Sequence, residues 1–248
     1  MANVNYFSIE FNSDAQKFVS FPFIVDGIPV EGIFCGISLR SAGDMKYNEH
    51  NQNRLSLFTD LALEPANVYG LNQIHSQSAL VVDRNNPPAA PADGMVTRDR
   101  SITLSVTVAD CLPVFLFDTT SGAFGIVHSG WKGTGIAVQA LNLMNKHWET
   151  KPCDVAAILG PCIDSCCYKV DAERAAIFEK EFGSQCVRQT GEDFFLDLKA
   201  ANIKILTDAG IQNIAVCQDC TFTDERLGSF RRQGETYTRM IAMIGVKK

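Results

Sequence analysis

"SITLSVTVADCLPVFLFD", residues 101–118, is the stretch that decides the fold. Valine, isoleucine, leucine and phenylalanine fill it on both sides of an Ala-Asp-Cys break, and "AFGIVH" at residues 123–128 continues the pattern. Apolar runs this continuous are typical of strands covered on both faces, because a strand with one face in water alternates apolar and polar residues. The stretch therefore predicts central strands with other layers packed on both sides.

Strand and helix patterns alternate over most of the remaining chain. Further strands are expected at 30–40, within 68–83 on either side of a break, and at 155–160, 213–219 and 238–246. Apolar stripes with helical spacing predict helices at 49–63, 134–148, 171–183 and 197–210. The proline-rich segment 83–94 has no periodicity, and we expect a surface loop there. The fold class is mixed α/β, in one domain over residues 1–248.

Composition excludes several classes of function. The chain has 248 residues, and its 22 Lys and Arg are intermixed with 28 Asp and Glu, giving a net charge of -6. No basic run is present, so we expect no nucleic-acid partner. No apolar run approaches the roughly 20 residues that span a bilayer, and the N-terminus resembles no signal peptide. We therefore expect a cytoplasmic protein without membrane contact, whose nine cysteines are free thiols or ligands rather than disulfides.

His75, Cys111 and His128 each stand where an apolar strand breaks. The other two histidines lie in polar helical surroundings and are interpreted as surface residues. Two imidazoles and a thiolate suit a catalytic zinc with one open position, but they also suit a cysteine nucleophile with a histidine base. A buried cysteine beside two hydrogen-bonded histidines is a third interpretation, and spacing alone favours it. Intervals of 36 and 17 residues form no local ligand motif, so the residues alone leave these alternatives open.

"HSGWKGTG", residues 128–135, offers a possible anion site. Its glycines lead into a predicted helix with Thr134 as the N-cap, and Lys132 supplies a positive charge near the free backbone N–H groups. Arg40 and Arg231 are further candidate anion contacts. An ordinary tight turn between strand and helix would also explain the glycines.

Two cysteine-rich segments, "GPCIDSCCYKV" (160–170) and "CQDC" (217–220), could together form a structural zinc site. However, Cys217 completes a buried strand, and the first segment lacks the CxxC spacing. Packing is the interpretation that we favour for these cysteines.

Six motifs occur in the order that one known family shows. They are "NQIHS", "ADCLPVFLFD", "GIVHSGWKGTG", "GPCIDSCCYKV", "DLKAAN" and "CTFTDERLGSFRRQG". Together they resemble the laccase-domain family of multi-substrate purine nucleoside enzymes, which has also been labelled polyphenol oxidase and peptidoglycan editing factor. The resemblance extends from about residue 36 to the C-terminus.

The resemblance implies a single α/β domain of layered mixed β-sheets flanked by helices. It also implies a zinc site formed by His75, Cys111 and His128, of which Cys111 and His128 are counted as catalytic too. The implied activities are phosphorolysis of adenosine, inosine, guanosine and S-methyl-5′-thioadenosine, and hydrolytic deamination of adenosine. Purine nucleosides and phosphate are then the partners, and the protein is expected to be a monomer or homodimer.

Roles for further residues follow from that chemistry. A water activated by zinc would attack purine C6, with Asp110 expected to transfer the proton. Phosphorolysis needs cations that position phosphate, for which Arg40, Lys132 and Arg231 are the candidates, and Trp131 is a candidate wall for the base.

Three alternatives remain beside this expectation. A copper-dependent, laccase-like phenol oxidase would need many histidine ligands, mostly in H-x-H pairs, whereas this chain has four histidines and no such pair. A cysteine hydrolase using Cys111 and His128 could act on peptidoglycan precursors. A nucleoside-binding module would bind purines without turnover.

Overall fold

The quoted stretch supplies two strands, β9 (Thr103–Val108) and β10 (Leu112–Asp118), which belong to two different sheets. This is seen in the computed structural model, which describes residues 2–48 and 50–247. The chain passes from one sheet to the other at Asp110, whose backbone has a φ of 83°. The Ala-Asp-Cys break is thus the point at which the chain crosses between two stacked sheets.

Both sheets contain parallel and antiparallel pairs. The order in the seven-stranded sheet is β1 (Asn3–Phe7), β16 (Asn213–Cys217), β12 (Val155–Leu159), β10, β11 (Phe124–Ser129), β8 (Gly94–Thr97) and β7 (Ala79–Val81). The order in the five-stranded sheet is β2 (Phe18–Phe21), β5 (Ile33–Ser38), β17 (Met240–Val246), β9 and β6 (Val68–Tyr69). The strands expected on either side of the 68–83 break therefore join different sheets.

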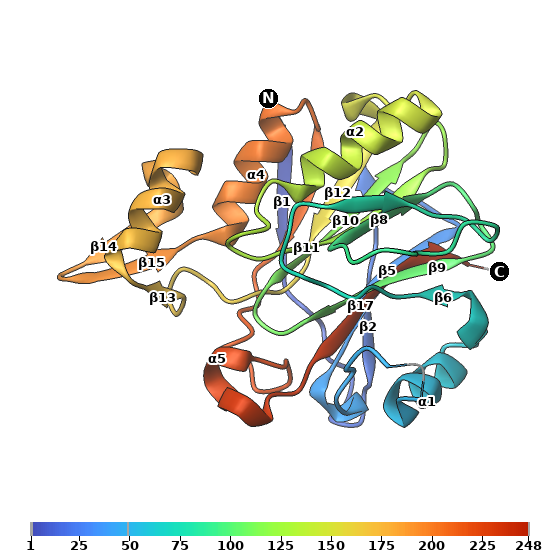
Figure 1. The fold of residues 1–248 in the computed structure, drawn as a ribbon, viewed down its shortest axis with the longest axis horizontal. Helices are drawn as coiled ribbons and strands as arrows, with labels where there is room; N and C mark the ends of the chain where they lie inside the picture. Colours follow the sequence, from blue (N-terminus) through green and yellow to red (C-terminus); the bar gives the residue numbers. More distant parts are fainter. Residues whose placement is uncertain (1, 49, 248) are drawn as a thin grey trace.

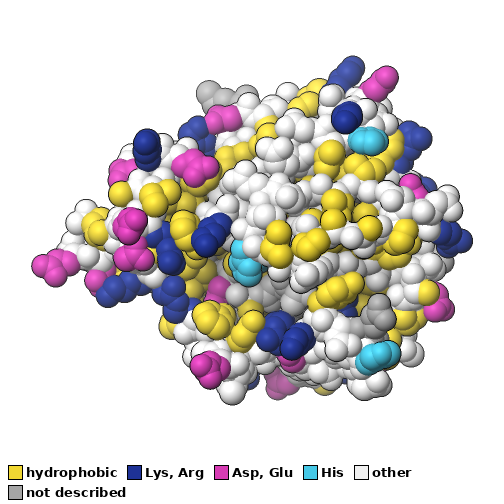
Figure 2. Space-filling view, in the orientation of Figure 1, with side chains coloured by type: hydrophobic (Ala, Val, Ile, Leu, Met, Phe, Trp, Pro, Cys, Tyr) yellow, Lys and Arg dark blue, Asp and Glu magenta, His cyan; other side chains and the backbone are white. Residues whose placement is uncertain are grey.

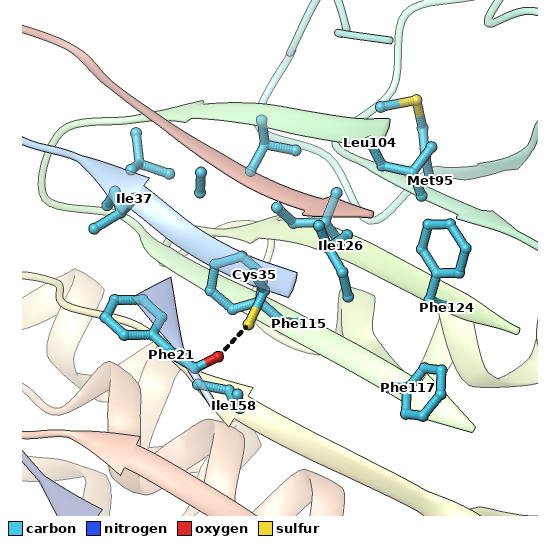
Figure 3. Packing of buried hydrophobic residues seen from close by; sticks show 14 of the residues in the cluster. Phe21, Cys35, Ile37, Met95, Leu104, Phe115, Phe117, Phe124, Ile126 and Ile158 are labelled. Atoms are coloured by element: carbon cyan, nitrogen blue, oxygen red, sulfur yellow. Dashed lines mark hydrogen bonds between the residues drawn. The ribbon is translucent and has the colours of Figure 1, made fainter. Parts of the chain in front are cut away.

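The side chains of β10 alternate between two cores, as period-two geometry requires. Phe115 and Phe117 point into the core between the sheets, where Phe115 lies beside Phe21 and Ile158 (Figure 3) and Phe117 packs against Phe23. The leucines and valine at 112, 114 and 116 point to the other face, under the helices. Each buried side chain of this size contributes about 1.5–3 kcal/mol to folding, so a strand buried on both faces anchors both cores.

Helices cover the outer faces (Figure 1). α2 (Ile136–Trp148) and α4 (Leu198–Asp208) pack on the seven-stranded sheet, and α1 (Gln52–Asp60) packs on the five-stranded one. α3 (Ala172–Phe182) lies against a small sheet of β13 (Lys169–Val170), β15 (Asp193–Leu196) and β14 (Val187–Thr190), which projects to one side. A hairpin of β3 (Ile24–Val25) and β4 (Ile28–Pro29) and a short α5 (Phe230–Gln233) complete the fold.

The predicted fold class is confirmed: the structure is mixed α/β with layered mixed sheets flanked by helices. The helix expected at 49–63 is shorter at both ends: it begins after Asn51, whose side chain caps it, and it ends at Asp60. Glu49 lies outside the described residues. The helix expected to end at Gly183 ends at Phe182, and Gly183 follows as its C-cap with a positive φ of 100°, which glycine adopts without steric cost. Among the described residues, no helix is long and apolar enough to cross a membrane.

Candidate metal centre

The fold brings His75, Cys111 and His128 together. His75 lies in the connection between β6 and β7, Cys111 immediately precedes β10, and His128 lies in β11. One ligand atom from each lies within 4.8 Å of the others, and the two imidazole centroids are 4.9 Å apart. Antiparallel pairing of β10 with β11 sets Pro113 opposite His128, which carries Cys111 to the same end of the sheet. Three remote segments therefore meet at one point.

Two residues of this centre have unusual backbone conformations. His75 and Asp110 have φ values of 58° and 83°, in the left-handed region that residues other than glycine rarely adopt. Such conformations persist only where the surrounding structure imposes them, and they concentrate at functional sites. At His75 the backbone is held by hydrogen bonds to one carboxylate, that of Asp93.

Asp93 is the residue that holds both histidines. Its fully buried carboxylate accepts hydrogen bonds from the N–H groups of residues 74, 75 and 76, at 3.2, 3.0 and 2.7 Å, and from the Ser76 hydroxyl at 2.8 Å. His128 Nδ1 donates to the same carboxylate at 2.9 Å. Because Nδ1 of His128 is engaged, Nε2 is the nitrogen left for a metal, the arrangement that metal-binding histidines commonly show.

Sequence reasoning missed Asp93, because it lies in the proline-rich segment 83–94 that we expected to be a surface loop. The middle of that segment is exposed, but Ala92 and Asp93 are completely buried. Asp93 is buried because it directly precedes β8, the strand that pairs with β11. An acidic residue directly before a buried strand, in a chain with candidate histidine ligands, was the available signal.

Charge within the centre stabilises a thiolate beside an imidazolium. Burial acts to raise the pKa of Cys111, but the charge of His128 and hydrogen bonds from both histidines outweigh it and lower the pKa to about 6. Burial acts to lower the pKa of His128, but the Cys111 thiolate and Asp93 outweigh it and raise the pKa to about 9. Between these pH values the metal-free pair holds one proton, on the imidazole.

Zinc binding to the metal-free protein is expected to release about one proton from this pair at pH 7.5. Zinc requires both the thiolate and a neutral imidazole, so the proton on His128 must leave. Zinc affinity should rise about tenfold per pH unit between the Cys111 pKa of about 6 and the His128 pKa of about 9, and more steeply below that range. Isothermal titration in buffers of different ionisation enthalpy measures the proton count, and a pH-independent affinity would contradict the ion pair.

The metal centre opens into a cavity of about 610 Å³. Its aromatic lining comes from Tyr47, Trp131, Tyr168, Phe230 and Tyr237, and its cationic lining from Lys46, Arg174, Arg231 and Arg239. Several arginines stack on these rings: Arg174 lies 4.6 Å from the centroid of Trp131, and Arg239 lies 4.4 Å from that of Tyr237. Figure 2 shows cationic side chains on both sides of an exposed histidine in the middle of this face.

The predicted substrate contacts separate into two groups. Trp131, Arg231 and Asp110 line the cavity. Arg40 instead donates from its guanidinium to the carbonyl of Glu225 at 2.7 Å, and Lys132 lies 5.5 Å from the Trp131 ring centroid, outside the cavity lining. Arg40 begins a short 3₁₀ turn rather than ending its strand. Its side chain therefore contacts Glu225 instead of the cavity.

Both carboxylate oxygens of Asp110 already accept hydrogen bonds. The Thr221 hydroxyl donates to one at 2.6 Å, and the Arg231 backbone N–H donates to the other at 2.7 Å. These contacts fix the segment that carries Arg231 against the metal centre. Each oxygen keeps a second lone pair, so the proton-transfer role expected for Asp110 stays a prediction.

Close contacts explain the glycines behind His128. A Cβ at Gly130 would lie 2.9 Å from the Cys111 sulfur, and one at Gly133 would lie 3.0 Å from the Ser76 carbonyl oxygen. Gly135, with a φ of 104°, is the N-cap of α2. The predicted N-cap at Thr134 is therefore wrong: its hydroxyl donates to the carbonyl of Gly130 at 2.9 Å.

A protein-family model, curated proteins and solved structures are all similar to this chain. The family described as "Multi-copper polyphenol oxidoreductase laccase" matches residues 34–247. A purine nucleoside phosphorylase of Corynebacterium glutamicum is 34% identical over 75% of this chain and 76% of its own, and one of Campylobacter jejuni is 31% identical over 87% and 92%. The crystal structure of YlmD from Geobacillus stearothermophilus superposes with a TM-score of 0.84 at 26% identity, covering 97% of this chain and 100% of that one. The resemblance seen in the sequence motifs is thus confirmed, and the protein belongs to the laccase-domain family.

Proposed function

We propose that the protein is a zinc-dependent purine nucleoside phosphorylase that also deaminates adenosine. The observation that carries the proposal is the position of His75, Cys111 and His128 in a cavity lined by aromatic and cationic side chains. Relatives named purine nucleoside phosphorylase support the reaction class. The proposed substrates are adenosine, inosine, guanosine and S-methyl-5′-thioadenosine, with inorganic phosphate as co-substrate.

The donor set fits zinc. Two imidazole nitrogens and one thiolate are ligands that zinc prefers, and three protein ligands are the number that leaves a position open. Asp93 orients His128, and the missing side chain at Gly130 leaves room beside the Cys111 sulfur. The chemistry supplied there by a bound zinc is Lewis acidity at neutral pH. Multicopper oxidation of phenols would need many histidine ligands, mostly in H-x-H pairs, whereas this chain has four histidines and no such pair.

Different residues of the cavity bind the purine base and the phosphate. Trp131 and Tyr168 offer flat faces for a purine, while Arg174 and Arg231 offer charge and hydrogen-bond donors for phosphate. In phosphorolysis a phosphate oxygen bonds to ribose C1′ as the C1′–N9 bond breaks, and the departing base takes a proton. Arginines that hold phosphate in line with C1′ favour this step by orientation. We propose that Asp110, beside Cys111, moves the proton in deamination.

The direct test is turnover by the purified, zinc-loaded protein. Inosine with phosphate should yield hypoxanthine and ribose 1-phosphate, and adenosine without phosphate should yield inosine, both followed by chromatography. A protein that binds zinc but converts neither nucleoside would refute the proposal.

Replacing Arg174 with glutamine is expected to raise the KM for phosphate about 10- to 100-fold, because a charge-assisted hydrogen bond of about 1.5–3 kcal/mol is lost. Deamination of adenosine, which uses no phosphate, should change little. Arg188→Gln is the matched control, since Arg188 also stacks on an aromatic ring, 4.1 Å from the Phe195 centroid, but lies outside the cavity lining. Equal losses in both reactions would place Arg174 in general substrate binding instead.

A further inference from the structure

Five of the nine cysteines lie in two segments that the fold pairs side by side. Residues 162–167 follow β12. Residues 217–220 begin at the last residue of β16, the strand that pairs with β12. Cys162 and Cys220 form a parallel β-bridge, and the Thr221 N–H donates to the Cys162 carbonyl at 3.0 Å. The pairing fixes the second cysteine-rich segment against the first.

Three of these cysteines point at a common position. The sulfur atoms of Cys166, Cys167 and Cys220 all lie within 4.8 Å of one another, and those of Cys166 and Cys167 are 3.0 Å apart. Cys162 and Cys217 are completely buried and lie outside this group, so the packing interpretation applies to them. Cys166 is exposed, which gives solvent access to the three-thiol cluster.

The backbone around the three-thiol cluster is held in place before any ligand binds. The carbonyl of Asp164 accepts hydrogen bonds from the N–H groups of Cys167 and Tyr168, both at 2.9 Å, which closes the turn. The Asp164 N–H donates to the Cys220 sulfur at 3.3 Å. The Asp164 carboxylate is itself paired with the largely buried Lys199 at 2.9 Å. Such prior ordering lowers the entropic cost of bringing three ligands to one ion.

We propose that Cys166, Cys167 and Cys220 form a second metal site, an all-thiolate site that binds Cu(I). Thiolates are soft ligands that select Cu(I) or zinc. An ion about 2.3 Å from three sulfurs sets them about 4 Å apart. That spacing lies between the 3.0 Å that separates the Cys166 and Cys167 sulfurs and the 4.8 Å within which all three sulfurs lie. Zinc in structural sites takes four ligands, whereas this group within the described residues offers three. The site goes beyond the proposed nucleoside chemistry and does not depend on it.

The test uses the full-length Cys111→Ser protein, in which the first centre is disabled. Under anaerobic conditions it is titrated with Cu(I) in competition with a chromogenic Cu(I) chelator. We expect one copper per chain, with an ultraviolet band from thiolate-to-copper charge transfer. Adding Cys166→Ser should weaken binding by at least about 100-fold, because even lost supporting partners weaken metal binding about 10- to 100-fold. Cys166 is exposed, so this variant tests the site without disturbing a core.

Cys153→Ser is the matched control, because Cys153 is also an exposed thiol but lies outside the cluster. It should leave Cu(I) binding unchanged. Maleimide labelling followed by mass spectrometry should show that Cu(I) protects Cys166 and Cys167 but not Cys153. Copper retained in both Cys166→Ser and Cys167→Ser, or displaced by an equal concentration of zinc, would overturn the proposal.

Discussion

Replacing Cys111 with serine is expected to abolish zinc binding at the first centre and to lower phosphorolysis of inosine on the order of 1,000-fold. A serine hydroxyl does not ionise at neutral pH, so the centre loses its only anionic ligand. The loss of a Lewis acid removes several kcal/mol of transition-state stabilisation, and each 1.36 kcal/mol is a factor of about ten in rate. Metal content by mass spectrometry and kcat/KM with saturating phosphate measure the two effects.

The Cys153→Ser variant serves as the control for thiol loss as such, since Cys153 is exposed and lies outside the group of ligands at the centre. It should retain zinc and full turnover. Full zinc occupancy together with undiminished activity in Cys111→Ser would contradict both the assignment of Cys111 as a zinc ligand and the proposed mechanism.

Chelation separates the proposed phosphorylase from a cysteine hydrolase. The thiolate and imidazolium at Cys111 and His128 are also the arrangement of an activated cysteine nucleophile, so geometry alone favours neither. Removing zinc should abolish phosphorolysis and deamination. A hydrolase acting on peptidoglycan precursors would instead gain activity, because its thiolate would be released from the metal. A nucleoside-binding module would bind purines with no product in either state.

The sequence singled out His75, Cys111 and His128 as candidates because each was expected where an apolar strand breaks. Strands covered on both faces tolerate few polar residues, so an imidazole or thiol at a strand end stands out. Their convergence was not predictable from spacing, since it depends on which strands pair. β9 and β10 are contiguous in the sequence but lie in different sheets, and that crossing, at Asp110, is what directs Cys111 toward His128.

The cations that line the cavity were predictable only in part. Arg231 reaches the cavity because its backbone is tied to Asp110, a contact between residues far apart in the chain. Arg174 lies on α3 among other charged residues, and its sequence context resembles any solvated helix face. Arg40 was expected to end a strand and Lys132 to follow one, but a position near a strand end gives no information about which way the side chain points.

Replacing Asp93 with asparagine is expected to weaken zinc binding about 10- to 100-fold, the usual effect of losing the partner that orients a ligating histidine. The amide keeps one acceptor but presents an NH₂ group to the N–H donors of residues 74–76 and His128. An unpaired buried donor costs about 1–3 kcal/mol, so the free energy of unfolding should also fall by about that amount. Competition with a zinc indicator measures affinity, and denaturant unfolding of the metal-free protein measures stability.

Asp118→Asn is the control that separates orientation of the ligands from stability. Asp118 is also buried, and its carboxylate accepts hydrogen bonds from the N–H groups of Thr120 and Ser121 and from the Ser121 hydroxyl. It stands at the end of β10 opposite to Cys111, so its replacement should destabilise the protein similarly while zinc affinity stays unchanged. Equal losses of zinc affinity in both variants would mean that stability alone governs the centre. A loss confined to Asp93→Asn would mean that one carboxylate positions both histidines for the metal.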